Sequence, residues 1–222
     1  MCHNVTMLKD LDHIFRQDYN LSELSEDSVH KNPFEQFKTS FNDIIDSKVK
    51  QPNSMVLSTV NSDGIPSSRV VLLKHFDEKG FVFFTNYTST KGQNINHNSN
   101  VSLLFFSIDL ERQIHIHGNA LKVSYDESNA YFKSRPFGSQ IAAMSSRQSQ
   151  QVNSRKSLED DYKRLYTQHE SNLPNCPDYW GGYRVEPHYF EFWQGRPSRL
   201  HDRICYKLDS NLQSWTIFRK SP

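Results

Sequence analysis

The stretch from Ser54 to Thr85, SMVLSTVNSDGIPSSRVVLLKHFDEKGFVFFT, decides the fold. It holds three runs rich in Val, Leu, Ile and Phe, which we expect to be strands over Ser54–Val60, Ser68–Phe76 and Phe81–Thr85. The residues between the runs, Asn61-Ser62-Asp63-Gly64 and Asp77 to Gly80, are typical of turns. Short strands joined by turns of this kind predict an antiparallel meander.

A helix precedes this meander. Pro33 is suited to the first turn of a helix, and the apolar residues that follow recur at three- and four-residue spacing before Pro52: Phe34, Phe37, Phe41, Ile44 and Ile45. Residues 1 to 32 are polar without a sustained apolar period, and we expect a mobile N-terminal arm with one short helical turn near Leu11 to Tyr19. The predicted domain therefore covers residues 33 to 222.

Beyond the meander the pattern alternates between strands and helices. We expect further strands at 101–107, 112–123, 189–194, 204–208 and 215–219. Helices are expected at 88–98, 125–134, 139–146 and 154–169, and a proline-rich loop at 173–179. Strands, a helical interlude and returning strands predict an α+β protein, a small β-barrel with flanking helices.

The composition excludes several classes of protein. Of 222 residues, 36% are hydrophobic and 13% aromatic, which is enough for a packed core. No run approaches the roughly 18 apolar residues of a membrane span, and the first ten residues lack a secretory signal, so we expect a cytoplasmic protein without membrane contact. The 26 basic and 25 acidic residues nearly balance, which disfavours nucleic acid as a partner. Three widely spaced cysteines indicate reduced thiols.

Basic residues stand beside several apolar runs without a matching cluster of acids: Arg69, Lys74, Arg135, Arg199, His201 and Arg203. Each alone is explained by a carboxylate partner, but together they indicate bound anions such as phosphates. Arg69 and Lys74 point to opposite faces of a regular strand unless a bulge intervenes. Arg199, His201 and Arg203 share one face if their segment is extended, which would make an anion platform.

Other motifs carry less weight. His115 and His117 share a strand face, but no third ligand is evident, and we predict no metal site. Gly181-Gly182 lacks the spacing of a phosphate loop and is better explained as a tight turn after Trp180. No nucleophile with an adjacent base is found by spacing, so a cofactor would have to supply the reactivity.

Eight segments in order, taken together, resemble the pyridoxamine 5′-phosphate oxidase family from about Pro33 to the C-terminus. They are Arg69–Lys74 (RVVLLK), Phe83–Asn86 (FFTN), Leu110–Gln113 (LERQ), Tyr131–Pro136 (YFKSRP), Ser146–Ser149 (SRQS), Tyr179–Gly182 (YWGG), Glu191–Gly195 (EFWQG) and Arg199–Arg203 (RLHDR). The resemblance implies an FMN-binding split β-barrel that forms a homodimer with two FMN molecules at the subunit interface. It further implies oxidation of pyridoxamine 5′-phosphate and pyridoxine 5′-phosphate by O2 to pyridoxal 5′-phosphate, with H2O2 released, and ammonia from the amine.

The resemblance also implies residue roles. The residues that would contact FMN are Arg69, Val70, Val71, Leu72, Leu73, Lys74, Phe84, Thr85, Lys91, Gln113, Gln148, Ser149, Trp193 and Arg203. Those that would hold the substrate are Lys74, Tyr131, Arg135, Ser139, Arg199 and His201, with Arg199 and His201 as the catalytic pair. In the N-terminal arm, Arg16 and Tyr19 resemble an Arg-x-x-Tyr element that closes over the family's active site.

The sequence departs from the family pattern at a few positions. Thr90-Lys91 stands where the family commonly has Arg-Lys, which removes one cation from an FMN phosphate site but keeps Lys91. Phe137 replaces a frequent Arg, and the last residues differ from the usual Arg-Leu-Ala-Pro. The sequence does not give the preference between amine and alcohol substrates.

Three other functions compete with the oxidase. The first is a flavin- or pyridoxal-phosphate-binding barrel without turnover, against which Arg199 and His201 count because they would contact only substrate. The second is a flavin reductase or nicotinamide-dependent oxidoreductase, in which Tyr131, Arg135 and Ser139 would have no evident use. The third is a nucleic-acid-binding barrel, which the balanced charge disfavours.

Overall fold

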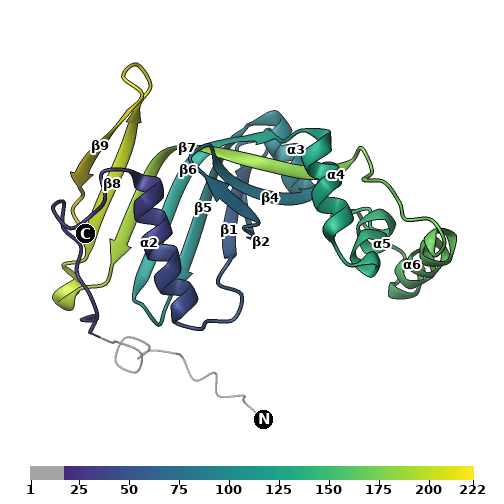
Figure 1. Cartoon of the computed structure of the whole chain (residues 1–222), viewed down its shortest axis with the longest axis horizontal. Helices are drawn as coiled ribbons and strands as arrows, with labels where there is room; N and C mark the ends of the chain where they lie inside the picture. The colour runs from purple at the N-terminus through teal and green to yellow at the C-terminus, as the bar shows by residue number, and fades with distance from the viewer. Residues whose placement is uncertain (1–17) are drawn as a thin grey trace, which may run out of the picture.

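A computed structural model of the chain describes residues 18 to 222 (Figure 1). It is an α+β fold, as expected from the sequence. The strands are β1 (Ser54–Val60), β2 (Pro66–Leu72), β3 (His75–Asp77), β4 (Gly80–Asn86), β5 (Asn100–Ser107), β6 (Arg112–Lys122), β7 (Trp180–Gln194), β8 (Asp202–Asp209) and β9 (Ser214–Arg219). The helices are α2 (Pro33–Asp46), α3 (Thr90–His97), α4 (Tyr125–Ser134), α5 (Phe137–Ser145) and α6 (Arg155–His169), with a short 3-10 turn at Pro197–Arg199.

The strands form one antiparallel sheet that divides along β7. Its main order is β2-β1-β5-β6-β7-β4-β3, and β8 and β9 continue from β7 on a separate branch. One edge of β7 pairs with β6, while the other edge pairs with β4 over Trp180–Val185 and with β8 over Tyr189–Gln194. The single strand β7 therefore connects the two ends of the curled sheet in Figure 1. This is the split barrel that the resemblance implied.

The expected strand at 189–194 is too short, because β7 already begins at Trp180, and the turn expected at Gly181-Gly182 is wrong. Both glycines lie inside the strand. A Cβ on Gly181 would lie 2.2 Å from the Tyr87 hydroxyl oxygen, so glycine is needed there for close packing and not for a turn. The register of β6 and β7 shifts where the partner of His117 is Tyr189 and that of Gly118 is Pro187. His188 is thus an extra residue in a β-bulge, which bends the strand.

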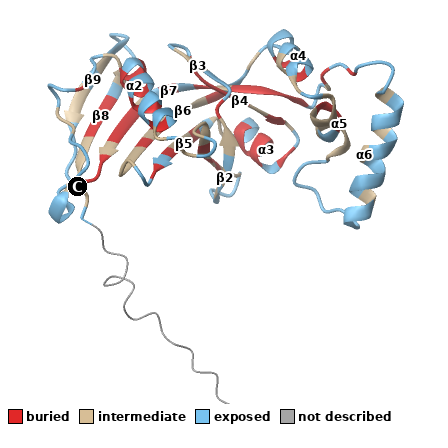
Figure 2. Cartoon of the chain, turned by 60° about the horizontal axis from the view of Figure 1, so that its bottom comes forward, coloured by how far each residue is buried: buried red, intermediate tan, exposed pale blue. Residues whose placement is uncertain are grey.

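Helix α2 and the core confirm the apolar pattern. Asn32 caps the helix by accepting a hydrogen bond from the amide of Phe34, and Pro33 occupies the first turn. Phe37 is fully buried and its ring lies 4.8 Å from that of Phe81 and 5.1 Å from that of Phe105. Figure 2 shows this buried layer between α2 and the sheet. The aromatic side chains of one helix therefore close one face of the sheet.

Most other elements agree with the sequence within one or two residues. The expected strand 68–76 is instead two strands, because the chain leaves the sheet at Leu73 and Lys74 between β2 and β3. Helix α5 begins at Phe137, two residues before its expected start. No helix within the described residues 18 to 222 is long and apolar enough to cross a membrane.

Residues 18 to 32 lie along the end of the sheet that carries β8. The backbone amides of Asn20 and Leu21 donate to the Glu111 carboxylate, and the amide of Leu24 donates to Asp202. Arg16 and most of the helical turn expected near Leu11 to Tyr19 lie outside the described residues.

Candidate active site

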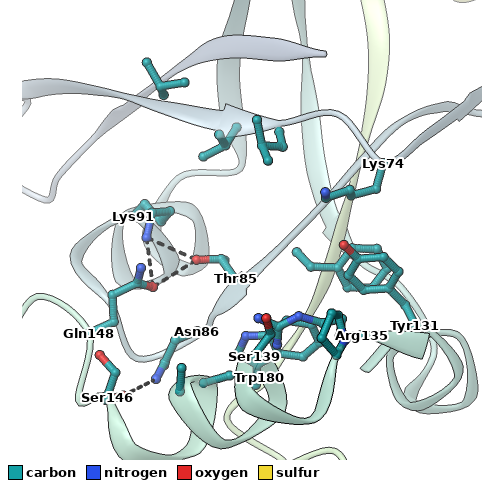
Figure 3. Close-up of a pocket in the computed structure, with 17 residues that line it drawn as sticks. Lys74, Thr85, Asn86, Lys91, Tyr131, Arg135, Ser139, Ser146, Gln148 and Trp180 are labelled. Carbon is teal, nitrogen blue, oxygen red and sulfur yellow. Dashed lines mark hydrogen bonds between the residues drawn. The ribbon is translucent and has the colours of Figure 1, made fainter. Parts of the chain in front are cut away.

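A cavity of about 610 Å³ lies between β2, β4, α3, α4 and α5 (Figure 3). Its residues come from separate parts of the chain: the end of β2 and Lys74 after it, β4, α3, the helices α4 and α5, and the start of β7. Eleven of the residues expected to bind FMN or substrate line it: Val70, Val71, Leu72, Lys74, Phe84, Thr85, Lys91, Tyr131, Arg135, Ser139 and Gln148.

Lys91 is the buried cation at one end of the cavity. Ser89 caps helix α3, which places Lys91 in its first turn. The ammonium donates hydrogen bonds of 3.1 Å each to Thr85 Oγ1, Ser89 Oγ and Gln148 Oε1, all of them neutral oxygens. Burial, and secondly the charge of Arg69, lowers the pKa of Lys91 to about 8. A buried ammonium whose partners are all neutral suits an anion, which would neutralise its charge.

Arg69 does not line the cavity, but its charge acts on Lys91 at this end. Its guanidinium donates to the carbonyl of Leu57 and to the hydroxyls of Thr59 and Ser67 at 3.1, 2.8 and 2.6 Å. Burial lowers its pKa, and none of these partners is acidic. The expected opposite orientation of Arg69 and Lys74 assumed that both lie in one strand. Lys74 instead lies beyond the end of β2, so the alternation of strand faces does not apply to it.

Arg135 is the second cation, at the opposite end of the cavity, in the link between α4 and α5. One of its terminal nitrogens, NH1, is buried without a hydrogen-bond partner in the described part of the chain. The guanidinium carbon lies 4.8 Å from the Trp180 ring centre, and burial lowers the pKa of Arg135. An unsatisfied buried donor on a charged group is costly, so this position also suits an anion.

An aromatic wall joins the two cationic positions. The rings of Phe84 and Tyr131 stack with centres 3.8 Å apart, and Trp180 lies parallel to Tyr131 within 3°. The ammonium of Lys74 lies 6.0 Å from the Tyr131 ring centre. On the other side Val70 is 65% exposed, so an apolar strand edge faces outward beside the cavity. Flat aromatic ligands pack well against surfaces of this kind.

A second group of expected site residues lies at the other end of the sheet. The His201 ring is 4.6 Å from the Trp193 ring and 5.8 Å from the Tyr19 ring, between centres. Gly195 lies directly beneath Tyr19, since a Cβ there would be 2.6 Å from Tyr19 Cγ. Gln113 is the cross-strand partner of Trp193 in β6. Figure 1 places β8 and the helices α4 and α5 at opposite ends of the molecule.

The expected anion platform of Arg199, His201 and Arg203 is wrong as a strand face. Arg199 lies in the 3-10 turn, His201 lies between that turn and β8, and only Arg203 is in the strand. Arg203 also has a carboxylate partner, because Glu191 accepts from its Nε and NH2 at 2.8 and 2.7 Å. The deficit of acids that we inferred from the sequence therefore holds for Lys91 and Arg135 but not for Arg203.

Two further expected contacts differ in position. The side chain of Leu73 is buried in the core, and its backbone amide and carbonyl bond to Asn53, so it does not line the cavity. Ser149 lies exposed in the loop after α5 with a left-handed backbone, φ 72°. His115 bonds to Ser102 at 2.6 Å, and no group of three or more metal-ligating side chains occurs in the portion of the chain described.

Sequence reasoning missed several site residues. Ser89 holds Lys91, Trp180 supports Arg135, and Glu191 fixes Arg203. Trp180 belongs to a quoted motif, but we interpreted that motif as a turn. The alternation of Glu191 with Phe190 and Phe192 was a usable signal, because an acid between two core aromatics needs a buried partner.

The fold and the site together define the class of protein, a split β-barrel with a cationic cavity that has an aromatic wall. A family described as pyridoxamine 5′-phosphate oxidase matches residues 41–169, and one described as the pyridoxine 5′-phosphate oxidase C-terminal dimerisation region matches residues 180–222. The chain belongs to the pyridoxamine 5′-phosphate oxidase family and is an oxidoreductase of that family. The resemblance inferred from the eight segments is thereby confirmed.

Individual relatives agree with this assignment. The chain is 49% identical over 207 residues to a pyridoxine/pyridoxamine 5′-phosphate oxidase of Paraburkholderia phytofirmans, covering 93% of this chain and 97% of the relative. A similar oxidase of Rippkaea orientalis is 49% identical over 210 residues, covering 93% and 97%. PhzG from Burkholderia lata, solved with tetrahydrophenazine-1-carboxylic acid, has a TM-score of 0.84 at 28% identity and covers 91% of this chain and 99% of its own.

A more distant protein shares the fold alone. An FMN-binding protein of Nostoc punctiforme, related to pyridoxamine 5′-phosphate oxidase, has a TM-score of 0.66 at 15% identity and covers 86% of this chain and 98% of its own.

Proposed function

We propose that this chain is a homodimeric, FMN-dependent oxidase that converts pyridoxamine 5′-phosphate and pyridoxine 5′-phosphate to pyridoxal 5′-phosphate, with O2 as the oxidant. The observation that carries the proposal is that one cavity holds two separate cationic positions. Neither Lys91 nor Arg135 has a carboxylate partner within residues 18 to 222. A cofactor phosphate and a substrate phosphate would satisfy one position each.

The Lys91 end fits the phosphate of FMN. Its ammonium already faces neutral oxygens, and Arg69 adds a second positive charge close by. The apolar end of β2, with Val70 exposed and Val71 and Leu72 half-buried, suits the flat ring system of a flavin. Gln148 completes this end through its bond to Lys91, and Ser149 is adjacent to it in the chain.

The Arg135 end fits the phosphate of a vitamin B6 substrate. Ser139 and Tyr131 line the cavity beside Arg135 and offer hydroxyl groups, while the buried NH1 of Arg135 offers a charged donor. The stacked Phe84 and Tyr131 rings give the space between the two cations an apolar wall, against which the substrate ring would pack. Lys74, at the edge of the same wall, provides a further cation toward the substrate.

The second group of site residues completes the cavity from the other copy of the chain. Arg199 and His201 directly precede β8, neither of them lines the cavity, and Figure 1 shows β8 at the end of the molecule opposite α4 and α5. The family region that covers β7 to β9 is described as a dimerisation region, which supports this arrangement. In the dimer Arg199 and His201 orient the substrate ring, and Gln113, Trp193 and Arg203 contact the cofactor. Tyr19, whose ring packs against His201, covers the substrate from the N-terminal segment.

The reaction balances as a two-electron oxidation. The alcohol loses two electrons and two protons to give the aldehyde, and O2 gains them to give H2O2. The amine undergoes the same oxidation, and water then releases ammonia. FMN, when bound, would supply the two-electron redox chemistry that links the substrate to O2. The chain binds, orients and desolvates the substrate. Holding the reacting groups in position in this way lowers the barrier to the oxidation.

An absorption spectrum during anaerobic titration tests the proposal. The purified protein should be yellow and dimeric, and pyridoxamine 5′-phosphate should bleach the flavin, whereas pyridoxamine without its phosphate should do so only at much higher concentration. Arg135→Ala should keep FMN but raise the required substrate concentration roughly 10- to 100-fold, the value of a hydrogen bond to a charged group. Lys91→Met should instead bind FMN much more weakly than the wild type. Bound FMN that neither phosphorylated substrate reduces would contradict the proposal.

A further inference from the structure

The turn between β7 and β8 has a backbone that L-amino acids rarely adopt. Ser198 has φ 57° and Arg199 has φ 61°, both in the left-handed region, and neither is glycine. The turn is only partly closed by its own backbone, through the Leu200 amide and the Pro197 carbonyl at 3.1 Å. Two consecutive residues of this kind persist only where the surroundings hold them. Arg199, which the proposed function assigns to the substrate, is one of them.

His201 supplies the missing constraint. Its Nδ1 accepts a hydrogen bond of 3.1 Å from the backbone amide of Arg196, which closes the turn from residue 196 to residue 201. The imidazole itself packs against the rings of Trp193 and Tyr19, which also contact each other. Arg196 is fixed as well, because its guanidinium lies 2.9 Å from Glu23 and 3.7 Å from Asp202. Both ends of the Arg196–His201 bond are therefore held by the protein.

This bond determines which form of the imidazole is present. A backbone N–H only donates, so Nδ1 must carry a lone pair, and the neutral ring must hold its proton on Nε2. We propose that His201 is a positioning residue, and that its unprotonated Nδ1 holds the left-handed turn that presents Arg199 to the substrate. This role is separate from any contact of His201 with substrate, and it rests on the proposed function for the part that concerns Arg199.

The proposal includes a dependence on pH. The charged groups near the ring are Arg199 and Arg196 in the turn and Asp202 after it, while Tyr19 packs on it from the N-terminal segment and Trp193 from β7. Burial, and then the charge of Arg199, lowers the pKa of His201 against the opposing effect of Asp202. The ring is thus neutral near pH 7. Acid protonates Nδ1, which then has no lone pair for the Arg196 amide, and the turn opens.

Two variants separate Nδ1 from Nε2. In His201→Asn the amide oxygen takes nearly the place of Nδ1, whereas in His201→Gln the longer side chain reaches toward the place of Nε2 and leaves the Arg196 amide without an acceptor. Each is made alone and combined with Arg199→Ala in the full-length protein. Arg199→Ala should lower kcat/KM roughly 100-fold in the wild type and in His201→Asn, but less than about 3-fold in His201→Gln, where the turn is already open.

A readout without substrate accompanies the kinetics. Hydrogen exchange at the Arg196 amide, corrected for its intrinsic rate, should be slow in the wild type and in His201→Asn and fast in His201→Gln. Acid should accelerate it in the wild type but not in His201→Asn. An equal Arg199→Ala penalty in all three backgrounds would overturn the proposal, as would slow exchange in His201→Gln. If the wild type does not oxidise the substrates, the proposed function is wrong, and hydrogen exchange still tests whether His201 holds the turn. If neither variant folds, the pH dependence of Arg196 amide exchange in the wild type is the test, and exchange that acid does not accelerate would overturn the proposal.

Discussion

Lys91 shows how a single residue sets a condition on the whole site. Its ammonium is buried among neutral oxygens, so the folded protein without ligand carries a cation that it does not neutralise. The cost appears as the pKa of about 8, lowered by burial first and by Arg69 second. A phosphate bound beside Lys91 would reverse that shift, because a nearby negative charge favours the protonated form. Binding of the anion and of a proton are therefore linked.

This linkage predicts that FMN affinity falls in alkaline solution. Below pH about 8 Lys91 is charged before FMN arrives, whereas above it binding must also take up a proton. The dissociation constant should therefore be nearly flat from pH about 7 to 8 and then rise up to about tenfold per pH unit. Quenching of flavin fluorescence measures it. Lys91→Met should bind weakly without this slope, and the same slope in that variant would contradict the prediction.

Glu191 is the carboxylate partner of Arg203, which we had expected from the sequence to be free of acidic partners. Its carboxylate accepts from Tyr189 at 2.7 Å as well as from Arg203, and Lys220 lies 3.5 Å away. Burial alone would raise the pKa of Glu191, but the hydrogen bonds from Tyr189 and Arg203 outweigh it and lower the pKa. The carboxylate therefore stabilises the fold above its ordinary pKa, and this contribution is lost as the pH falls through the lowered one.

Glu191→Gln should lower the free energy of unfolding by about 2 to 4 kcal/mol at neutral pH, less than for a fully buried pair because Arg203 is partly exposed. Urea unfolding measures the loss, and the difference from the wild type should shrink below pH about 4. Glu35→Gln is the matched control, since Glu35 pairs with Lys38 at 3.6 Å on the surface. A loss no larger in Glu191→Gln than in the control would show that the pair contributes nothing.

Among the elements, α2 was predictable and the first half of β7 was not. The spacing of Phe34, Phe37 and Phe41 reports a helix face directly, because it depends on the helix alone. Residues 180 to 188 contain Gly181, Gly182 and Pro187, which are unfavourable in strands. They form a strand because neighbouring side chains approach the glycines and because the bulge at His188 absorbs the proline. Both causes lie in other segments, and no local pattern reports them.

The packing of α2 gives a prediction at the same scale. Phe37→Ala removes a fully buried ring that contacts several other aromatic rings, and it should cost about 3 to 5 kcal/mol of unfolding free energy. Ile45→Ala on the same helix is the control, because Ile45 is 46% exposed and its loss should stay within about 0.5 kcal/mol. Chemical denaturation of the two variants side by side measures both. Equal losses would mean that α2 does not close the core.

At the scale of the molecule, the resemblance proposed a set of site residues, but motifs and spacing could not show how these residues are distributed over the fold. The resemblance assigned both groups to one site. In the structure Arg135 ends α4 and Arg199 lies in the turn before β8, and Figure 1 shows α4 and β8 at opposite ends of the molecule. Sequence spacing cannot show this, because the separation depends on how far β7 extends and which strands pair with each half. The geometry of a dimer is a property of two surfaces, and neither surface has a periodic signature in one chain.

That separation has a genetic consequence. If each cavity takes Arg135 from one copy and Arg199 from the other, an Arg135→Ala chain and an Arg199→Ala chain complement each other. Their mixed dimer concentrates both lesions in one cavity and leaves the second cavity intact. After random exchange of equal amounts, half of the dimers are mixed, and about a quarter of wild-type activity should return from two impaired preparations. Cells that depend on the enzyme should likewise grow with the two alleles together but not with either alone, whereas a site built within one chain would give no such rescue.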